Sequence, residues 1–182
     1  MIAKQDPEPR LRVLHFIEVG NMTICQLNEE DIRDFAALYR DYFNAEGDAW
    51  SVERAYRRLH QMWSIEDSIG LKAVRKGRIC GILLGCLEWF DDGPCFHILE
   101  VLVLKEYQGM GIGSALVKEA ERAARSMGAA VSTLETLNDP AHERFYGRMG
   151  YTTRADLLCK VKKLQRFASW QSSAPKTDLH RG

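Results

Sequence analysis

Apolar residues along this chain switch between the three- to four-residue spacing of helices and the alternating or continuous runs of strands. A helical pattern follows Asn28, which precedes three acidic residues as an N-cap does. The same spacing predicts a second helix from about Ser51 and a third over 112–127, which Gly128 ends. Pro140 begins a fourth predicted helix, since proline is favoured in a first helical turn.

Strand patterns occupy much of the remaining sequence. The predicted strands are 22–27, 69–75, 78–90, 95–104, 131–136 and 151–161. The run 78–90 is apolar on both faces, which is typical of a central strand. Simple alternation in 95–104 places Phe96, Ile98, Glu100 and Leu102 on one face and His97 on the opposite face.

The chain has 182 residues, a length that suits one domain. Residues 1–21 are interpreted as an N-terminal extension, in which the apolar run 11–19 is a candidate edge strand. Residues 163–182 contain Ser-Ser-Ala-Pro and mixed charge, and we predict a mobile C-terminal tail there. These limits leave 22–162 as the predicted domain.

Composition removes several classes of function. Lysine plus arginine and aspartate plus glutamate each number 25, so no overall charge attracts nucleic acid. The five cysteines have no zinc-site spacing and are expected to be reduced core thiols, with no metal bound. There is neither an apolar run as long as a membrane span nor a signal-peptide pattern. A cytoplasmic protein without a membrane or nucleic-acid partner is expected.

A glycine-rich segment, 108–114, joins the apolar run 95–104 to the third predicted helix. Glycines allow the backbone to approach an anion, and a helix N-terminus offers unpaired N–H groups to phosphate. The segment is not a P-loop, because Ser114 and Ala115 stand where that motif needs lysine and then serine or threonine. Its G-x-G-x-G spacing also differs from the G-x-G-x-x-G of dinucleotide-binding folds.

The pattern Gln108-x-x-Gly111-x-Gly113, after a strand that carries Glu100, resembles the acetyl-CoA loop of the GNAT superfamily of N-acetyltransferases. A second similar element runs from Asn138 to Tyr151 and contains an Asn, an Ala, Phe-Tyr and Gly-Tyr. The resemblance covers about 22–162. It implies an α/β (α+β) fold with a mixed, largely antiparallel central sheet, splayed near its fourth and fifth strands and flanked by about four helices.

The resemblance also implies site residues, with acetyl-CoA as co-substrate. The main chain of Leu102, Val103 and Leu104 is implied to pair with the pantetheine arm. The residues implied to bind the diphosphate are Gln108, Gly109, Met110, Gly111, Ile112, Gly113 and Ser114. Asn138 is implied to contact the cofactor, and Tyr146 is implied to bring its hydroxyl to the CoA sulfur and to protonate the departing thiolate.

Glu100 is the candidate catalytic base, because it is the one acidic residue in an apolar strand. Its position looks like that of the glutamate which spermidine/spermine-type acetyltransferases place beside the acceptor amine. An ordinary Glu pKa of about 4.3 lies far below the amine's value of about 10, so a water chain or a raised pKa must close the gap. Glu88 and His97 are the alternative bases, and an ion pair with an arginine is the structural alternative for Glu100.

The acceptor is less defined by the sequence. Acidic and aromatic residues that suit a cationic amine lie at 88–92 and at Tyr39, Tyr42, Phe43, Glu46, Asp48 and Trp50. Arg54, Arg57 and Arg58 form a solvated helix face or meet an anionic acceptor or the CoA ribose phosphate. We expect acetyl transfer to a small-molecule amine by direct attack. The alternatives are a protein lysine or N-terminal acetyltransferase and a non-catalytic acyl-CoA-binding module, and a homodimer remains open.

Overall fold

The computed structural model describes residues 17–19 and 21–162. The chain divides into two units between Leu134 and Glu135, and each unit is described by itself. The predicted tail, 163–182, and most of the predicted extension lie outside the described residues. The domain limits 22–162 stay a prediction.

The first unit is built on a six-stranded sheet whose strands follow one another in chain order. The strands are β1 (Ile17–Val19), β2 (Met22–Gln26), β3 (Ser68–Arg75), β4 (Arg78–Phe90), β5 (Gly93–Val103) and β6 (Val131–Leu134). Each neighbouring pair from β1 to β5 is antiparallel. The β5–β6 pair is parallel, because a helix carries the chain back across the sheet between them. The predicted mixed, largely antiparallel sheet is confirmed.

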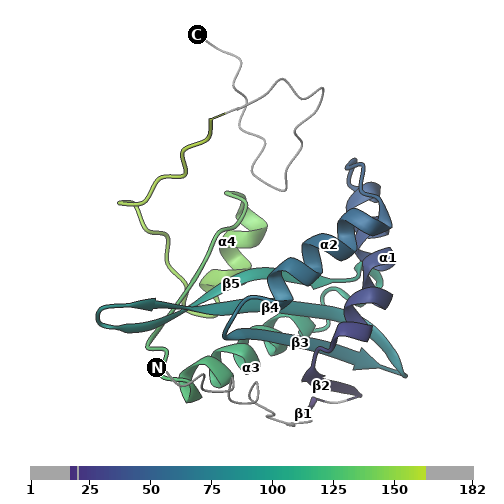
Figure 1. Cartoon of the computed structure of the whole chain (residues 1–182), viewed down its shortest axis with the longest axis horizontal. Coiled ribbons are helices and arrows are strands. Elements are labelled where there is room, and N and C mark those ends of the chain that lie inside the picture. Colours follow the sequence, from purple (N-terminus) through teal and green to yellow (C-terminus); the bar gives the residue numbers. More distant parts are fainter. Residues whose placement is uncertain (1–16, 20, 163–182) are drawn as a thin grey trace, which may run out of the picture. The chain divides into compact units, whose positions relative to one another are not determined.

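The predicted helices are confirmed, with their starts at the expected caps. They are α1 (Glu29–Ala45), α2 (Val52–Trp63), α3 (Ile112–Ser126) and α4 (Pro140–Gly147), with a short 3₁₀ turn η1 (Lys105–Tyr107). In the first unit, α1 and α2 lie on one face of the sheet and α3 lies on the other face (Figure 1). The helix α4 belongs to the second unit.

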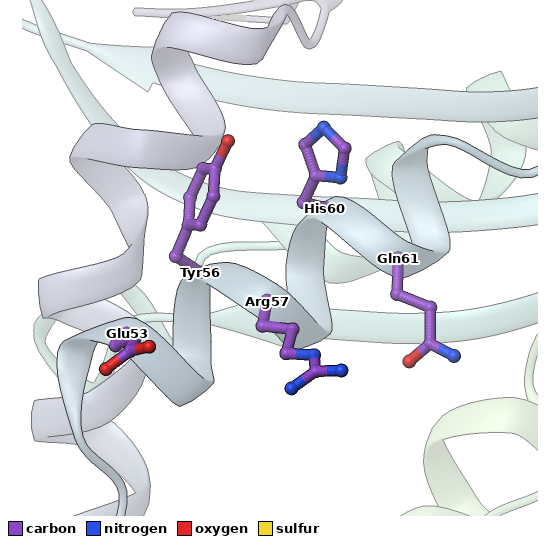
Figure 2. Close-up of a pocket in the computed structure, with 5 residues that line it drawn as sticks. All are labelled: Glu53, Tyr56, Arg57, His60 and Gln61. Atoms are coloured by element: carbon purple, nitrogen blue, oxygen red, sulfur yellow. The ribbon is translucent and has the colours of Figure 1, made fainter.

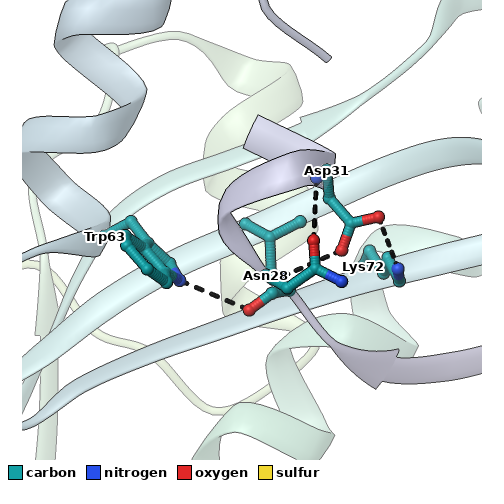
Figure 3. Close-up of polar contacts among 5 residues, drawn as sticks. Asn28, Asp31, Trp63 and Lys72 are labelled. Atoms are coloured by element: carbon teal, nitrogen blue, oxygen red, sulfur yellow. Dashed lines mark hydrogen bonds and ion pairs between the residues drawn. The ribbon is translucent and has the colours of Figure 1, made fainter. Parts of the chain in front are cut away.

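The start of α1 is fixed to the sheet and to α2 by polar contacts (Figure 3). Asn28 and Asp31 form a capping box, in which each side chain accepts a hydrogen bond from the other residue's backbone N–H, both at 2.9 Å. Lys72 of β3 pairs with Asp31 at 2.5 Å. The indole of Trp63, at the end of α2, donates to the Leu27 carbonyl at 3.3 Å. These contacts set where α1 runs over the sheet.

The apolar stripes of α1 and α2 form a core with one face of the central strands. Its buried members are Leu27, Ile32, Phe35, Ala36, Tyr39, Ala55, Leu59, Met62, Ile82, Leu84, Leu102 and Leu104. Tyr39 is the only one of these that carries a hydroxyl, and it is 2% exposed. A buried hydroxyl needs a hydrogen-bond partner, and the partner of Tyr39 belongs to the candidate site.

One predicted strand is wrong. Residues 151–162 contain no strand in the described structure, although their pattern predicts one over 151–161. A turn interrupts the run at 155–156, and Arg154 pairs with Asp156 across it at 2.5 Å. Leu157 and Leu158 are exposed, so the alternating apolar residues have no buried face to cover.

Candidate active site

A β-bulge in β5 sets the direction of the candidate base. Ile98 pairs with Gly85, whereas Glu100 pairs with the next residue along β4, Leu84. Leu99 is therefore an extra residue in β5, and the alternation of side chains reverses there. Because paired residues share a face, Glu100 points to the same side as Leu84, which belongs to the α1–α2 core.

The bulge overturns the expectation that four residues of this strand share one face. Phe96 and Ile98 face the α3 side of the sheet, whereas Glu100 and Leu102 face the α1–α2 side. His97 thus shares a face with Glu100, which simple alternation excluded. The prediction failed because it assumed an uninterrupted period of two, and one inserted residue inverts every position beyond it.

The Glu100 carboxylate lies against the buried hydroxyl of α1. Tyr39 donates its O–H to Oε2 of Glu100 at 3.0 Å. Burial raises the pKa of Glu100 above its ordinary value, while the Tyr39 hydrogen bond and the positive charge of Arg58 oppose the rise. Burial and the neighbouring carboxylate also raise the pKa of Tyr39, so its hydroxyl stays protonated and remains a donor.

A wall of aromatic rings packs against Tyr39, whose hydroxyl binds this carboxylate. The Tyr39 ring lies 4.6 Å from the Phe43 ring and 5.5 Å from the Trp50 ring, between centroids. The Trp50 indole donates to Oδ2 of Asp48 at 3.2 Å. Asn44 holds the Trp50 backbone through two hydrogen bonds, one to its carbonyl at 3.0 Å and one from its N–H at 2.7 Å. Part of the aromatic and acidic set predicted to contact the acceptor thus lies together, namely Tyr39, Phe43, Asp48 and Trp50.

Two other residues that were predicted to contact the acceptor substrate instead contact the glycine loop and the 3₁₀ turn η1 before it. Glu46 pairs with Lys105 of η1 at 2.5 Å. The Tyr42 hydroxyl accepts from the Gln108 side chain at 3.3 Å, and the same amide donates to the Val103 carbonyl at 3.0 Å. Gln108 therefore ties the loop to the end of β5 and to α1.

The glycine loop has the backbone conformation that its sequence predicts. Gly109 and Gly111 lie in the left-handed region, with φ of 74° and 78°. Gly111 is the N-cap of α3 and contributes no side-chain hydrogen bond, whereas Asn28 and Ser51 cap α1 and α2. The first backbone bond of α3 runs from the Ala115 N–H to the Gly111 carbonyl. The N–H groups of residues 112–114 precede that bond and have no partner within the helix.

A positive charge that the sequence pattern did not single out lies beside the loop. Arg75, the last residue of β3, places its Nη1 2.8 Å from the sulfur of Met110. The Met110 side chain is 54% exposed. A guanidinium is thus available near the left-handed glycines.

One edge of β5 is left open by the end of β6. β6 pairs with β5 only from Cys95 to Ile98, and β5 continues to Val103. The Leu104 N–H donates to the Cys80 carbonyl, on the β4 side. Because backbone groups alternate between the two edges of a strand, those of residues 101 and 103 point away from β4, where the Val103 carbonyl accepts from the Gln108 side chain. The predicted splay between the strands expected over 95–104 and 131–136 stays a prediction, since β6 ends at Leu134.

The remaining predicted residues lie in the second unit. Asn138 is exposed and precedes Asp139, whose side chain caps α4 by accepting from the N–H groups of residues 141 and 142. Tyr146 is half-buried in α4, and its ring lies 4.9 Å from that of Phe145 and 5.7 Å from that of Tyr151. The roles of Asn138 and Tyr146 stay predictions.

A hollow of about 640 Å³ lies elsewhere, along α2 (Figure 2). It is lined by Glu53, Tyr56, Arg57, His60 and Gln61. Of the residues considered for the site it contains only Arg57, for which a solvated helix face was the other interpretation. The candidate site is therefore sought at the edge of β5 and the glycine loop. Among the described residues, no three His, Cys, Asp or Glu side chains are grouped to hold a metal ion. None of the described helices has the length and apolar character needed to cross a bilayer.

Sequence reasoning did not connect Tyr39 or Arg58 with Glu100. Tyr39 is 61 residues away in the chain, and its spacing in α1 indicated only a core position. For Arg58 the sequence left open a solvated helix face or a contact with an anion, and its place three residues after the buried Ala55 sets it at the border of the buried stripe. The helical spacing of α2 was the signal available for Arg58, whereas no local signal joined Tyr39 to Glu100.

Comparison with known proteins identifies the family. The model of the acetyltransferase (GNAT) family matches residues 32–151. An uncharacterized N-acetyltransferase of Methanocaldococcus jannaschii is 34% identical over 94 residues, which are 50% of this chain and 58% of the relative. The chain thus matches little more than half the length of that relative.

Solved structures share the fold. A Pyrococcus furiosus protein assigned as an acetyl transferase is 26% identical, with a TM-score of 0.62 over 78% of this chain and 99% of its own. A predicted acetyltransferase of Clostridium acetobutylicum, solved with acetyl-CoA, is 13% identical, with a TM-score of 0.64 over 77% of this chain and 96% of its own. The chain belongs to the GNAT family of acetyltransferases.

Proposed function

We propose that this protein transfers an acetyl group from acetyl-CoA to the amine of a small molecule, by direct attack of the amine on the thioester in a ternary complex. Family membership supports acetyltransferase chemistry. The observation that carries the finer proposal is Glu100, a carboxylate held by Tyr39 on the strand that leads into the glycine loop.

Acetyl-CoA binding is proposed along the open edge of β5 and at the start of α3. The N–H groups of residues 112–114 and the positive helix end suit the diphosphate, and Arg75 adds a charge nearby. For the pantetheine arm, backbone alternation favours Val101 and Val103 over Leu102 and Leu104, whose backbone groups face β4. Asn138 is carried over as a further contact from the family resemblance alone.

Glu100 is proposed as the base. The acceptor nitrogen loses a proton to Glu100, directly or through water, forms a bond to the thioester carbon, and the carbon–sulfur bond breaks. The departing thiolate takes a proton from the Tyr146 hydroxyl in this scheme. Because burial raises the pKa of Glu100, the carboxylate is a stronger base than an exposed glutamate.

The acceptor is proposed to be small because the wall beside Glu100 is tightly held. Asn44 fixes the Trp50 backbone at both its N–H and its carbonyl, so this segment does not need an acceptor to order it. Aromatic faces and the Asp48 carboxylate attract an ammonium group. These features match the recognition of an amine group without requiring an extended peptide.

The test is thiol release from acetyl-CoA in the presence of small amines, aminoglycosides and lysine-containing peptides. We expect turnover with small amines. Turnover with peptides alone would indicate a protein acetyltransferase. Tight CoA binding without turnover on any amine would contradict the proposal and would favour a non-catalytic acyl-CoA-binding module.

A further inference from the structure

Arg58 occupies a position in α2 that differs from that of its neighbouring arginines. It lies three residues after Ala55 and four before Met62, both buried in the core that contains Tyr39. Residues at these spacings share a helix face, so Arg58 emerges at the border of the α1–α2 core. Arg58 is nevertheless exposed, so its long side chain reaches solvent beside that core.

The charge of Arg58 is felt by both groups of the Tyr39–Glu100 pair. The pKa of each is held down in part by the positive charge of Arg58, although burial raises both overall. With its place on the border of the core that contains Tyr39, this puts the Arg58 charge near the candidate base. The Arg54 and Arg57 charges are not among the causes of either shift.

Arg58 and Glu100 nevertheless do not form an ion pair. No carboxylate oxygen of the described residues lies within 4.0 Å of the Arg58 guanidinium, and no described residue accepts a hydrogen bond from it. On Glu100, Tyr39 occupies Oε2, and none of the described residues donates a hydrogen bond to Oε1. The Arg58 guanidinium and the Glu100 carboxylate thus lie near each other without direct contact, and each can still bind a group of a ligand.

A ligand that carries both charges fits this arrangement. An ammonium group is attracted to the Glu100 carboxylate and the Trp50 wall, and an anionic group matches the planar fork of the Arg58 guanidinium. A polyamine supplies only the first of these groups and would be repelled by Arg58. The arrangement therefore favours an acceptor with an anion close to its amine.

We propose that Arg58 is a specificity-determining residue that binds a carboxylate or phosphate of the acceptor, so that the preferred acceptors are small zwitterionic amines. The inference rests on the proposed acetyl transfer to a small amine. It narrows the acceptor class, because Arg58 contributes to binding only when the acceptor carries an anion.

The competing explanation is that Arg58 acts on Glu100 alone, by favouring its ionised form. Both explanations predict lower activity when Arg58 is removed, and they differ in how the loss depends on the acceptor. An effect through Glu100 is the same for every amine, whereas a direct contact is lost only for amines that carry the anion.

The test compares Arg58→Gln with wild type on paired acceptors. Each pair differs in the anion: an α-amino acid and its primary amide, and O-phosphoethanolamine and ethanolamine. With the anionic member we expect kcat/KM to fall about 10- to 100-fold, mainly through KM, and with the neutral member to change by less than about threefold. Dividing the kcat/KM of the variant by that of wild type for each acceptor cancels intrinsic differences in amine reactivity.

Arg57→Gln is the matched control, because it removes the same charge one residue away, where the side chain lines the separate hollow along α2. It should leave all four acceptors unchanged. Arg58→Lys should restore part of the loss, because it keeps the charge and removes the fork. The pair with the larger loss identifies the anion as carboxylate or phosphate.

Equal losses on both members of each pair would overturn the inference in favour of an effect through Glu100. A wild-type enzyme that acetylates amines without preferring the anionic members would also overturn it, while the proposed function would stand. Bound CoA without turnover on any acceptor would contradict the proposed function itself, and this inference with it.

Discussion

The Glu100 carboxyl has opposite effects on folding and on the proposed chemistry. Its pKa is raised in the folded protein, so the folded state binds this proton more tightly than the unfolded state does. The contribution of this group to stability is therefore complete below its ordinary pKa and declines as the pH rises through the raised pKa of the folded state. At neutral pH, ionisation of the buried Glu100 carboxyl lowers the stability of the fold. A buried glutamate with this cost is consistent with a catalytic role.

Replacing Glu100 by glutamine should separate the two effects. We expect kcat/KM to fall by about 10²- to 10⁴-fold, the usual contribution of a general base. We also expect the thermal midpoint at pH 8 to equal or exceed that of wild type, because the amide removes a buried charge and its oxygen still accepts from Tyr39. An E100Q protein with wild-type kcat/KM across the pH range would exclude Glu100 from the mechanism.

Tyr39→Phe tests the hydrogen bond to the base. Losing the donor removes an interaction that lowers the pKa of Glu100, so that pKa should rise further. Since the base acts when ionised, the acidic limb of the kcat/KM profile should move to higher pH. Tyr56→Phe is the control, because among the described residues its hydroxyl donates to Glu29, at 3.5 Å, and not to Glu100. The kcat/KM profile of this variant should stay in place. An unmoved limb in the Tyr39 variant would show that the hydrogen bond does not tune the base.

At the scale of elements, the bulge in β5 depends on a glycine in the facing strand. A Cβ built on Gly85 would lie 2.6 Å from the Phe96 ring and 2.7 Å from the His97 carbonyl. Phe96 is buried and cannot swing aside, and the carbonyl is backbone. The close approach of the two strands beside Leu99 is therefore available only to glycine at this position.

Gly85→Ala should destabilise the fold through this clash. We expect a loss of about 1–3 kcal/mol in the free energy of unfolding, measured by urea denaturation. Gly147→Ala is a matched control in α4, where an added Cβ meets nothing within 4 Å, and it should gain up to about 1 kcal/mol from helix propensity. A Gly85 variant as stable as wild type would mean that the strands can separate at the bulge without cost.

The elements that could be predicted from sequence are those with local signals. The capping box at Asn28, the apolar stripe of α3 and the glycines before it are each contained in a few neighbouring residues. The face of Glu100 could not be predicted, because the register of β5 on β4 depends on contacts between distant residues. The strand expected over 151–161 failed for a similar reason, since alternation alone does not supply a neighbour to pair with.

At the scale of the whole molecule, the site combines local and distant parts. The loop at 108–114 was located correctly as a helix-opening glycine turn because its motif is continuous. The base, its hydroxyl donor and the facing arginine come from β5, α1 and α2, and only the fold brings them together. The family resemblance implies the cofactor class, whereas the proposed acceptor class depends on the geometry that the three elements create.

Binding of CoA at the start of α3 is the central claim, and calorimetric titration of two Ser114 variants tests it most directly. A glutamate in the first turn favours the helix dipole, so Ser114→Glu should keep or raise the thermal midpoint while its charge repels the diphosphate. Ser114→Gln is the neutral control of similar size. We predict that Ser114→Glu binds CoA at least about tenfold more weakly than Ser114→Gln, with the difference shrinking at high salt. Equal CoA affinity of the two folded variants, or no binding by wild type, would contradict the account.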